Sequence, residues 1–176
     1  FAGCIVLILA ALVSRSLAED KNLHIFKAMG APAHPRVQVA WNRYHDSEGL
    51  ADIFKRLQNA YPRLARLYSI GQSYEERPLW CLEITNREKG DPARKPGMFI
   101  DGNIHGNEVQ TGEVVAYTAW YLCESFDSNE RVRFLLDHFV FYLVPTTNPD
   151  GRDFWFYYPN TANSSRSGKK PLDNDR

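Results

Sequence analysis

The sequence predicts an α/β fold in which a mixed, largely parallel central sheet is flanked by helices. Apolar runs of strand length alternate with longer segments whose apolar residues recur at helical spacing, and this alternation is typical of α/β proteins. Of the 176 residues, 44% are apolar and 13% aromatic, which is enough for one domain with a buried core. The polar stretches 101–108 and 145–151 each follow a strand-like run, where sheets of this class bind their ligands.

A helix and a hairpin are predicted in the first half of the chain. Asp46 and Ser47 are suited to cap a helix that ends before residue 62. The apolar residues at helical spacing in this helix are Leu50, Ile53, Phe54 and Leu57. Residues 65–70 and 79–85 are strand-like, and the polar segment 71–78 between them has the length of a hairpin connection.

A short strand and a long helix follow. Residues 97–101 are apolar without polar alternation, as expected of a strand covered on both faces. The longest predicted helix begins after Gly106 and reaches about Cys123. Because residues 114–122 are apolar nearly all round the helix, we expect this section to be buried.

The second half ends with another helix and the strongest strand. Asn129 is suited to cap a helix over residues 129–137. The inward face of this helix is predicted to comprise Val132, Leu135 and Leu136. Residues 139–144 are the most strand-like of the chain, whereas beyond Gly151 the periodicity is lost and residues 160–170 are expected to form a long loop.

The N-terminal residues have the pattern of a secretory signal. Residues 2–13 are an apolar run too short to cross a bilayer comfortably, and small residues follow up to Ala18. We expect residues 1–18 to be a signal peptide, residues 19–44 an extended lead-in, and the protein to be secreted or extracytoplasmic, which means periplasmic in a Gram-negative cell. A buried helix or an uncleaved anchor is the alternative. No Met or basic segment precedes the apolar run, so we expect the chain to start partway into its gene product.

Net charge indicates no macromolecular partner. The chain has 21 Lys and Arg against 21 Asp and Glu, so no overall field attracts it to nucleic acid or to an anionic membrane. We therefore expect no nucleic-acid binding, and no stable membrane insertion once a signal peptide has been removed.

Cysteine usage leaves two interpretations open. Cys81 lies in a predicted strand and Cys123 in a predicted helix, so the pair can form one disulfide, but their apolar surroundings favour two small buried hydrophobes. Neither has a second Cys nearby in the sequence with which it could form a metal-binding pair. Any metal site must therefore use His and carboxylate ligands.

His105 and Glu108 are the candidate metal ligands. An imidazole and a carboxylate three residues apart, where a strand turns into a helix, project to the same side and can reach one ion. Gly102 and Gly106 allow a tight bend there, and Asn103 and Asn107 can bond nearby backbone groups. The pair alone also fits a surface turn with a Glu near a helix N-terminus. Catalytic zinc usually has three protein ligands, so a third is required.

Three separated segments occur in the order found in a known family. In chain order they are Ser-Tyr-Glu-Glu-Arg-Pro-Leu-Trp-Cys-Leu-Glu-Ile at residues 73–84, Asp-Gly-Asn-Ile-His-Gly-Asn-Glu at residues 101–108, and Thr-Asn-Pro-Asp-Gly at residues 147–151. Together they resemble the zinc carboxypeptidases of the carboxypeptidase A and B type. In that family the hairpin segment, which begins here at residue 73, commonly reads Ser-x-Glu-Gly-Arg-Pro-Ile. The resemblance covers residues 45–176 and implies the N-terminal part of a truncated catalytic domain with that family's α/β/α fold.

The resemblance also implies roles for individual residues. His105 and Glu108 match the first two zinc ligands of the family. Arg166 is the candidate for the arginine that polarises the scissile carbonyl, with Arg152 as its competitor; the alternative for either is a solvated loop cation. Asn148, Asp150 and Gly151 are expected to shape a turn.

Other parts of the family's site are expected beyond residue 176. These are the third zinc ligand, which is a His, the Glu general base and the residues that bind the terminal carboxylate of the substrate. The earlier His45 is interpreted as a side chain at a helix start. We expect the 176 residues alone to be inactive and poorly folded, because their sheet lacks later strands. The acidic residues 173–175 fit either a calcium loop or a solvated turn.

The function implied is that of a secreted zinc-dependent carboxypeptidase, which hydrolyses the C-terminal bond of peptides or proteins with metal-activated water. One alternative is a zinc deacylase or amidase of similar fold. Another is a secreted binding module that has kept the fold and lost the chemistry.

Overall fold

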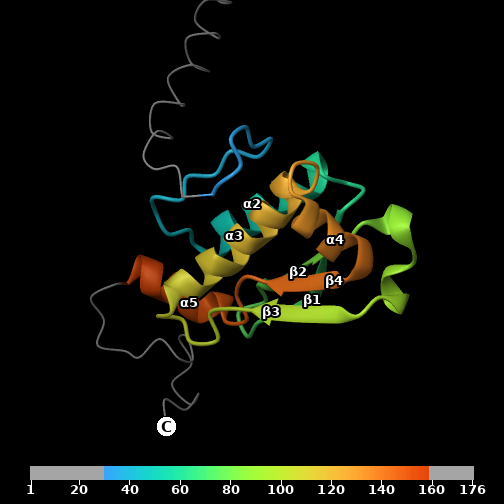
Figure 1. The fold of residues 1–176 in the computed structure, drawn as a ribbon. Coiled ribbons are helices and arrows are strands. Elements are labelled where there is room, and N and C mark those ends of the chain that lie inside the picture. Colours follow the sequence, from blue (N-terminus) through green and yellow to red (C-terminus); the bar gives the residue numbers. More distant parts are fainter. Residues whose placement is uncertain (1–29, 159–176) are drawn as a thin grey trace, which may run out of the picture. The chain divides into compact units, whose positions relative to one another are not determined.

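The structure is a computed structural model that describes residues 30–158 (Figure 1). Of these, residues 32–37 and 44–158 belong to one compact unit, and residues 30–31 and 38–43 belong to another. Residues 38–43 include a turn but no helix or strand. The candidate ligands His105 and Glu108 lie in the larger unit, whereas the predicted signal peptide, Arg166 and the acidic residues 173–175 lie outside the described residues.

A four-stranded mixed sheet forms the centre of the larger unit. Its order is β1 (Ala65–Gln72), β2 (Pro78–Ile84), β4 (Val140–Val144) and β3 (Gly97–Asp101). The β1–β2 and β2–β4 pairings are antiparallel and the β3–β4 pairing is parallel. The hairpin and the mixed sheet are as predicted, but the described strands are not largely parallel, because two of their three pairings are antiparallel. The parallel pair places the carboxyl ends of β3 and β4 at one edge.

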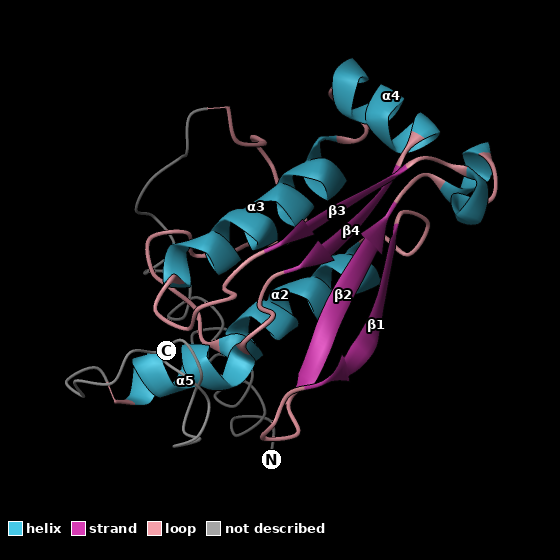
Figure 2. Cartoon of the chain, turned by 90° about the horizontal axis from the view of Figure 1, so that it is seen from below, coloured by secondary structure: helices cyan, strands magenta, loops and turns pink. Residues whose placement is uncertain are grey.

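Two helices cover one face of this sheet. Figures 1 and 2 show α2 (Ser47–Ala60) and α3 (Val109–Ser125) on the same side of the strands. The carboxylate of Asp46 accepts a hydrogen bond from the backbone N–H of Gly49 at 2.8 Å and caps α2, as predicted. The predicted apolar face is buried against the sheet and α3; its residues are Leu50, Ile53, Phe54 and Leu57. Within residues 30–158 no helix has both the length and the apolar character required to cross a membrane.

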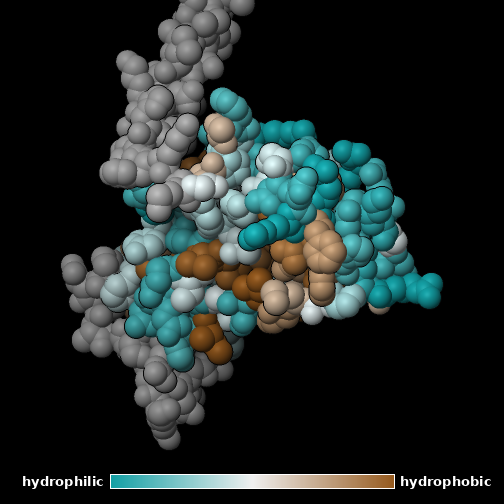
Figure 3. All heavy atoms as spheres, in the orientation of Figure 1, coloured by the Kyte–Doolittle hydropathy of each residue, from teal (hydrophilic) through white to brown (hydrophobic). Residues whose placement is uncertain are grey.

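The edge strand β3 is more exposed than its sequence predicts. Met98 is 52% exposed and Phe99 is 59% exposed, so cover on both faces was a wrong expectation for the described residues. Among the described strands β3 pairs with β4 alone. Figure 3 shows apolar side chains at the surface over the region of β3 and α3, where Ile104 and Val114 are also exposed.

The second and third α-helices of residues 30–158, α3 and α4, each bury one face. Val114 of α3 is 63% exposed, which contradicts burial on all sides, because the sheet and α2 cover only part of this helix. In α4 (Glu130–His138) Val132 and Leu136 are buried as predicted, whereas Leu135 is 36% exposed. The predicted cap Asn129 accepts hydrogen bonds from the first turn of α4.

The fourth α-helix of residues 30–158, α5 (Pro149–Tyr157), lies where the sequence predicted no further helix. Asn148 caps it by accepting from the backbone N–H of Gly151 at 2.8 Å, and Pro149 occupies the first turn. The residues expected to shape a turn therefore begin a helix. Its aromatic residues follow one another without helical spacing, which hid the helix from a periodicity argument.

Glu76, in the turn between β1 and β2, holds a left-handed backbone with a φ of 62°. This is the position at which the resembled hairpin motif has Gly. The Cβ of a non-glycine residue strains the left-handed backbone conformation. The Glu76 side chain is exposed.

We expect Glu76→Gly to raise the free energy of unfolding by about 0.5–1 kcal/mol, since the relief of strain exceeds the entropy cost of glycine. Urea unfolding is the measurement. The control Glu76→Ala removes the carboxylate but keeps the Cβ; an equal gain from both variants would assign the effect to charge.

Cys81 and Cys123 are free thiols, 2% and 1% exposed respectively. The structure therefore favours two small buried hydrophobes over a disulfide. Burial raises the pKa of both thiols, which disfavours the reactive thiolate.

We expect Cys81 and Cys123 to react with an aromatic disulfide reagent at pH 8 at least about 100-fold more slowly in the native protein than in guanidinium. Peptide mapping of the labelled protein checks this, and rapid native labelling of either residue would contradict it.

Candidate metal centre

The two polar stretches meet at the carboxyl edge of the sheet. The backbone N–H of Gly102 donates to Val144 O at 3.1 Å, and that of Thr147 donates to Gly102 O at 3.1 Å. The Asn148 side chain reaches Ile104 O at 3.4 Å. The loops after β3 and β4 are thus joined side by side, as the rule for parallel strands predicts.

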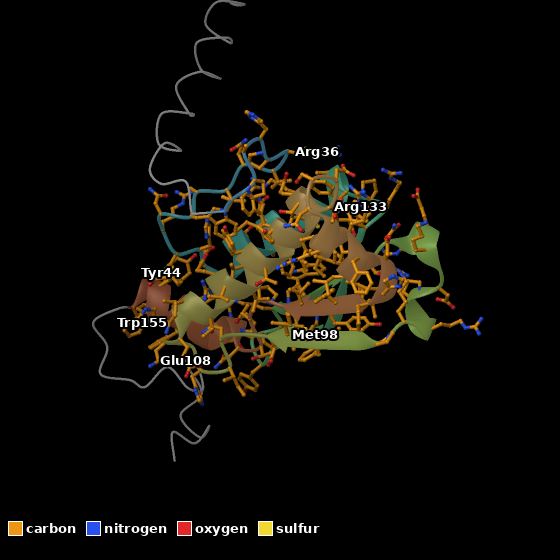
Figure 4. All side chains as sticks on the ribbon, viewed as in Figure 1. Arg36, Tyr44, Met98, Glu108, Arg133 and Trp155 are labelled. Atoms are coloured by element: carbon orange, nitrogen blue, oxygen red, sulfur yellow. The ribbon has the colours of Figure 1, made fainter. Side chains whose placement is uncertain are left out.

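His105 and Glu108 face each other in the first of these loops. The His105 Nδ1 atom lies 2.9 Å from Glu108 Oε1, and the backbone N–H of His105 donates to Glu108 Oε2 at 3.4 Å. Their side chains are 33% and 38% exposed. Figure 4 places Glu108 at the end of the molecule where β3 ends and α3 begins.

This pair fits a zinc ion by its chemistry. An imidazole nitrogen and a carboxylate are two of the donor types that zinc takes, they point at one place, and solvent reaches both. Within residues 30–158 no group of three or more His, Cys, Asp or Glu side chains is placed to hold a metal. Among the described residues, His105 and Glu108 are therefore the two candidate ligands at this place.

Asn103 shapes the loop that carries this pair. It is 1% exposed and has a left-handed φ of 56°, a conformation that Asn tolerates better than most residues. Its Nδ2 donates to His105 O at 2.6 Å and to Gly106 O at 3.2 Å, as local bonding of this residue predicted. At Gly102 a Cβ would lie 2.9 Å from Thr111 O, so glycine is required for the close approach to α3.

The hairpin motif and the Asn-Pro-Asp-Gly motif contact each other through Asp150. Its carboxylate is 7% exposed and accepts from Ser73 Oγ at 2.7 Å, Glu75 N at 3.0 Å and Arg77 Nη1 at 2.6 Å. Arg77 Nε also lies 3.1 Å from Asp153 Oδ2. The hairpin motif and the Asn-Pro-Asp-Gly motif are therefore bonded to each other. Together they hold the start of α5 beside the loop that carries His105 and Glu108.

Arg152 does not face solvent. It is fully buried, and all five of its N–H groups donate: to His45 O from Nε and Nη2, to Asn103 Oδ1 and Val109 O from Nη1, and to Glu113 from Nη2. Burial lowers its pKa, against the opposing effect of the Glu113 carboxylate. Arg152 is thus not the solvated loop cation given as its alternative, and it has no donor left for the competing role at a substrate carbonyl.

The cluster of His45, Glu113 and Arg152 was missed by sequence reasoning. His45 Nδ1 lies 2.8 Å from Glu113 Oε2, and its backbone N–H donates to Glu113 Oε1 at 2.8 Å, so it has the role at a helix start that was expected. One available signal was a cation in the first turn of a helix, where the helix dipole disfavours it unless a partner compensates. That signal required α5 to be recognised.

Known proteins resemble the chain along most of its length. Residues 50–175 match the zinc carboxypeptidase family. The chain is 32% identical over 153 residues to carboxypeptidase D of Anas platyrhynchos, which covers 77% of this chain and 11% of that protein. It is 34% identical over 110 residues to the carboxypeptidase N catalytic chain of Homo sapiens, which covers 62% of this chain and 24% of that protein.

Solved structures agree on the fold. Thrombin-activatable fibrinolysis inhibitor matches with a TM-score of 0.63 and 25% identity over 71% of this chain and 31% of that chain. Carboxypeptidase A of Helicoverpa armigera matches with a TM-score of 0.60 and 19% identity over 90% of this chain and 36% of that chain, which concerns the fold alone. The family match covers well over half of the 176 residues. The chain therefore belongs to the zinc carboxypeptidase family.

Proposed function

We propose that the chain is part of a zinc carboxypeptidase that hydrolyses the C-terminal peptide bond of peptides or proteins. The observation that carries this proposal is the His105–Glu108 pair, which lies at the carboxyl edge of the sheet within the family match. In this proposal residues 45–176 form the N-terminal part of the catalytic domain. The chain spans 11–24% of the two curated relatives named above, so activity is assigned to the whole gene product.

The proposed roles of the residues follow from their chemistry. His105 and Glu108 hold zinc, together with a His from the rest of the protein. When bound, zinc supplies Lewis acidity and lowers the pKa of its water. Arg166 holds the scissile carbonyl oxygen, a role from which Arg152 is excluded by its burial and by the five hydrogen bonds that it donates within the protein. The neighbouring loop from Thr147 keeps the His105 loop in place through its bond to Gly102.

The test uses the product of the natural gene. Metal analysis is expected to find one zinc per molecule, and a blocked dipeptide with a free carboxylate is expected to be hydrolysed. The matched control is the same dipeptide with an amidated C-terminus, which a carboxypeptidase should leave intact. Equal hydrolysis of both substrates would favour the deacylase or amidase, whereas absence of both zinc and turnover would favour a binding module.

We also propose that the protein is exported with residues 1–18 as its signal peptide. The support is the apolar run 2–13 followed by small residues up to Ala18. N-terminal sequencing of the exported protein is expected to start at Glu19. An N-terminus that retains the apolar run would contradict cleavage and favour an anchor.

A further inference from the structure

The segment between β3 and α3 is held at both ends by one side chain. Arg152 Nη1 donates to Asn103 Oδ1 at 2.8 Å and to Val109 O at 2.8 Å. These two acceptors bracket residues 104–108, which carry both candidate zinc ligands. The guanidinium lies beneath this segment without contacting solvent.

Asn103 connects Arg152 to the backbone of residues 104–108, which we call the ligand loop. Its amide oxygen accepts from Arg152, which leaves its Nδ2 group to donate to His105 O at 2.6 Å and Gly106 O at 3.2 Å. The orientation of the Asn103 amide is thereby fixed, since a flipped amide would place NH₂ against the guanidinium. The carbonyl of the first candidate ligand is thus two hydrogen bonds away from Arg152.

The cation itself is held by a fixed counter-charge. Arg152 Nη2 donates to Glu113 Oε1 at 2.7 Å, and the Glu113 side chain is 13% exposed. Glu113 is in turn bonded by the backbone and ring of His45 at the start of α2. Three helices, α2, α3 and α5, therefore converge on one buried ion pair directly behind the ligand loop.

We propose that Arg152 is a positioning residue for zinc, which sets the geometry of the His105–Glu108 loop through Asn103 and Val109. This inference rests on the proposed function. Arg152 is not a catalytic residue, because every one of its N–H groups is bonded to protein. Partners outside a ligand shell typically change metal affinity by about 10–100-fold when they are removed.

Two variants of the natural gene product separate positioning from general stability. Arg152→Lys keeps the charge opposite Glu113, but a single ammonium cannot reproduce the five-donor fork. Asn103→Gly keeps the left-handed backbone and removes the contacts to His105 and Gly106. The control is Val132→Ala, a buried residue of α4, which lies at the opposite end of the sheet from α5 in Figures 1 and 2.

Zinc dissociation constants are measured by chelator competition, with thermal unfolding and the visible spectrum of the cobalt-substituted protein alongside. We expect Arg152→Lys and Asn103→Gly to weaken zinc binding by about tenfold and to shift the cobalt bands. Val132→Ala should lower the melting temperature with neither effect. If Arg152→Lys fails to fold, the zinc affinity and cobalt spectrum of Asn103→Gly alone test the positioning role. Wild-type zinc affinity and an unchanged cobalt spectrum in the folded variants would overturn the positioning role alone, whereas a wild-type protein that binds no zinc would overturn the proposed function as well.

Discussion

Glu108→Ala or His105→Ala in the natural gene product is expected to lower kcat/KM by more than about 100-fold and to abolish stoichiometric zinc. The reason is that removal of a group outside the ligand shell already costs about 10–100-fold, and a ligand contributes more than its supporting groups. The two side chains contact each other at 2.9 Å, so either substitution leaves one donor where two converged. Zinc content and kcat/KM for the blocked dipeptide are the measurements.

The fold should survive these substitutions. The His105–Glu108 contact is about one third exposed on each side, and such pairs contribute less than about 1 kcal/mol. The zinc-dependent rise in melting temperature should disappear, because a ligand that no longer binds the native state adds no stability. Gln110→Ala, an exposed position two residues further on, is the control and should keep zinc and turnover. Full turnover and zinc content in both ligand variants would remove the basis of the proposed centre.

Arg77→Leu is expected to have the largest effect on stability. Arg77 joins Glu75, Asp150 and Asp153, and both aspartates are 7% exposed. Removing the cation leaves buried carboxylates without it, which costs about 3–5 kcal/mol for fully buried pairs. Because the Arg77 side chain is 34% exposed, solvent screens part of this, and we expect about 3 kcal/mol. Urea unfolding of the natural gene product is the measurement.

A matched control exists on the same molecule. Arg63 pairs with Glu88 at 3.0 Å, but the two side chains are 73% and 61% exposed. Arg63→Leu should therefore cost less than about 1 kcal/mol. Equal losses from Arg77→Leu and Arg63→Leu would show that the contacts between the hairpin and α5 are not stabilised by buried charge.

Local signals account for the parts of the fold that the sequence predicted. Asp46 and Asn129 cap their helices, and the apolar periodicity of α2 matches its buried face, because caps and periodicity act within one or two turns. The exposure of Phe99, Val114 and Leu135 could not be predicted in the same way. It depends on which other elements pack against β3, α3 and α4.

In the candidate site, too, local features could be predicted from the sequence and non-local ones could not. The spacing of His105 and Glu108 is a local property and predicts their convergence. The burial of Arg152 is not local, since its acceptors come from the start of α2, the β3–α3 loop and α3. Single-sequence reasoning has no means to sum these partners, so it considered only a catalytic arginine or a solvated loop cation for this residue.

The acceptors of Arg152 also bear on the order of folding. His45 O lies 107 residues before it in the chain, and Asn103 Oδ1 lies 49 residues before it. Closing such large loops is slow relative to local helix formation. If Arg152 has the proposed role, residues 104–108 are expected to acquire their final shape only after α5 has docked, and binding of the ion is expected to be a late event in folding.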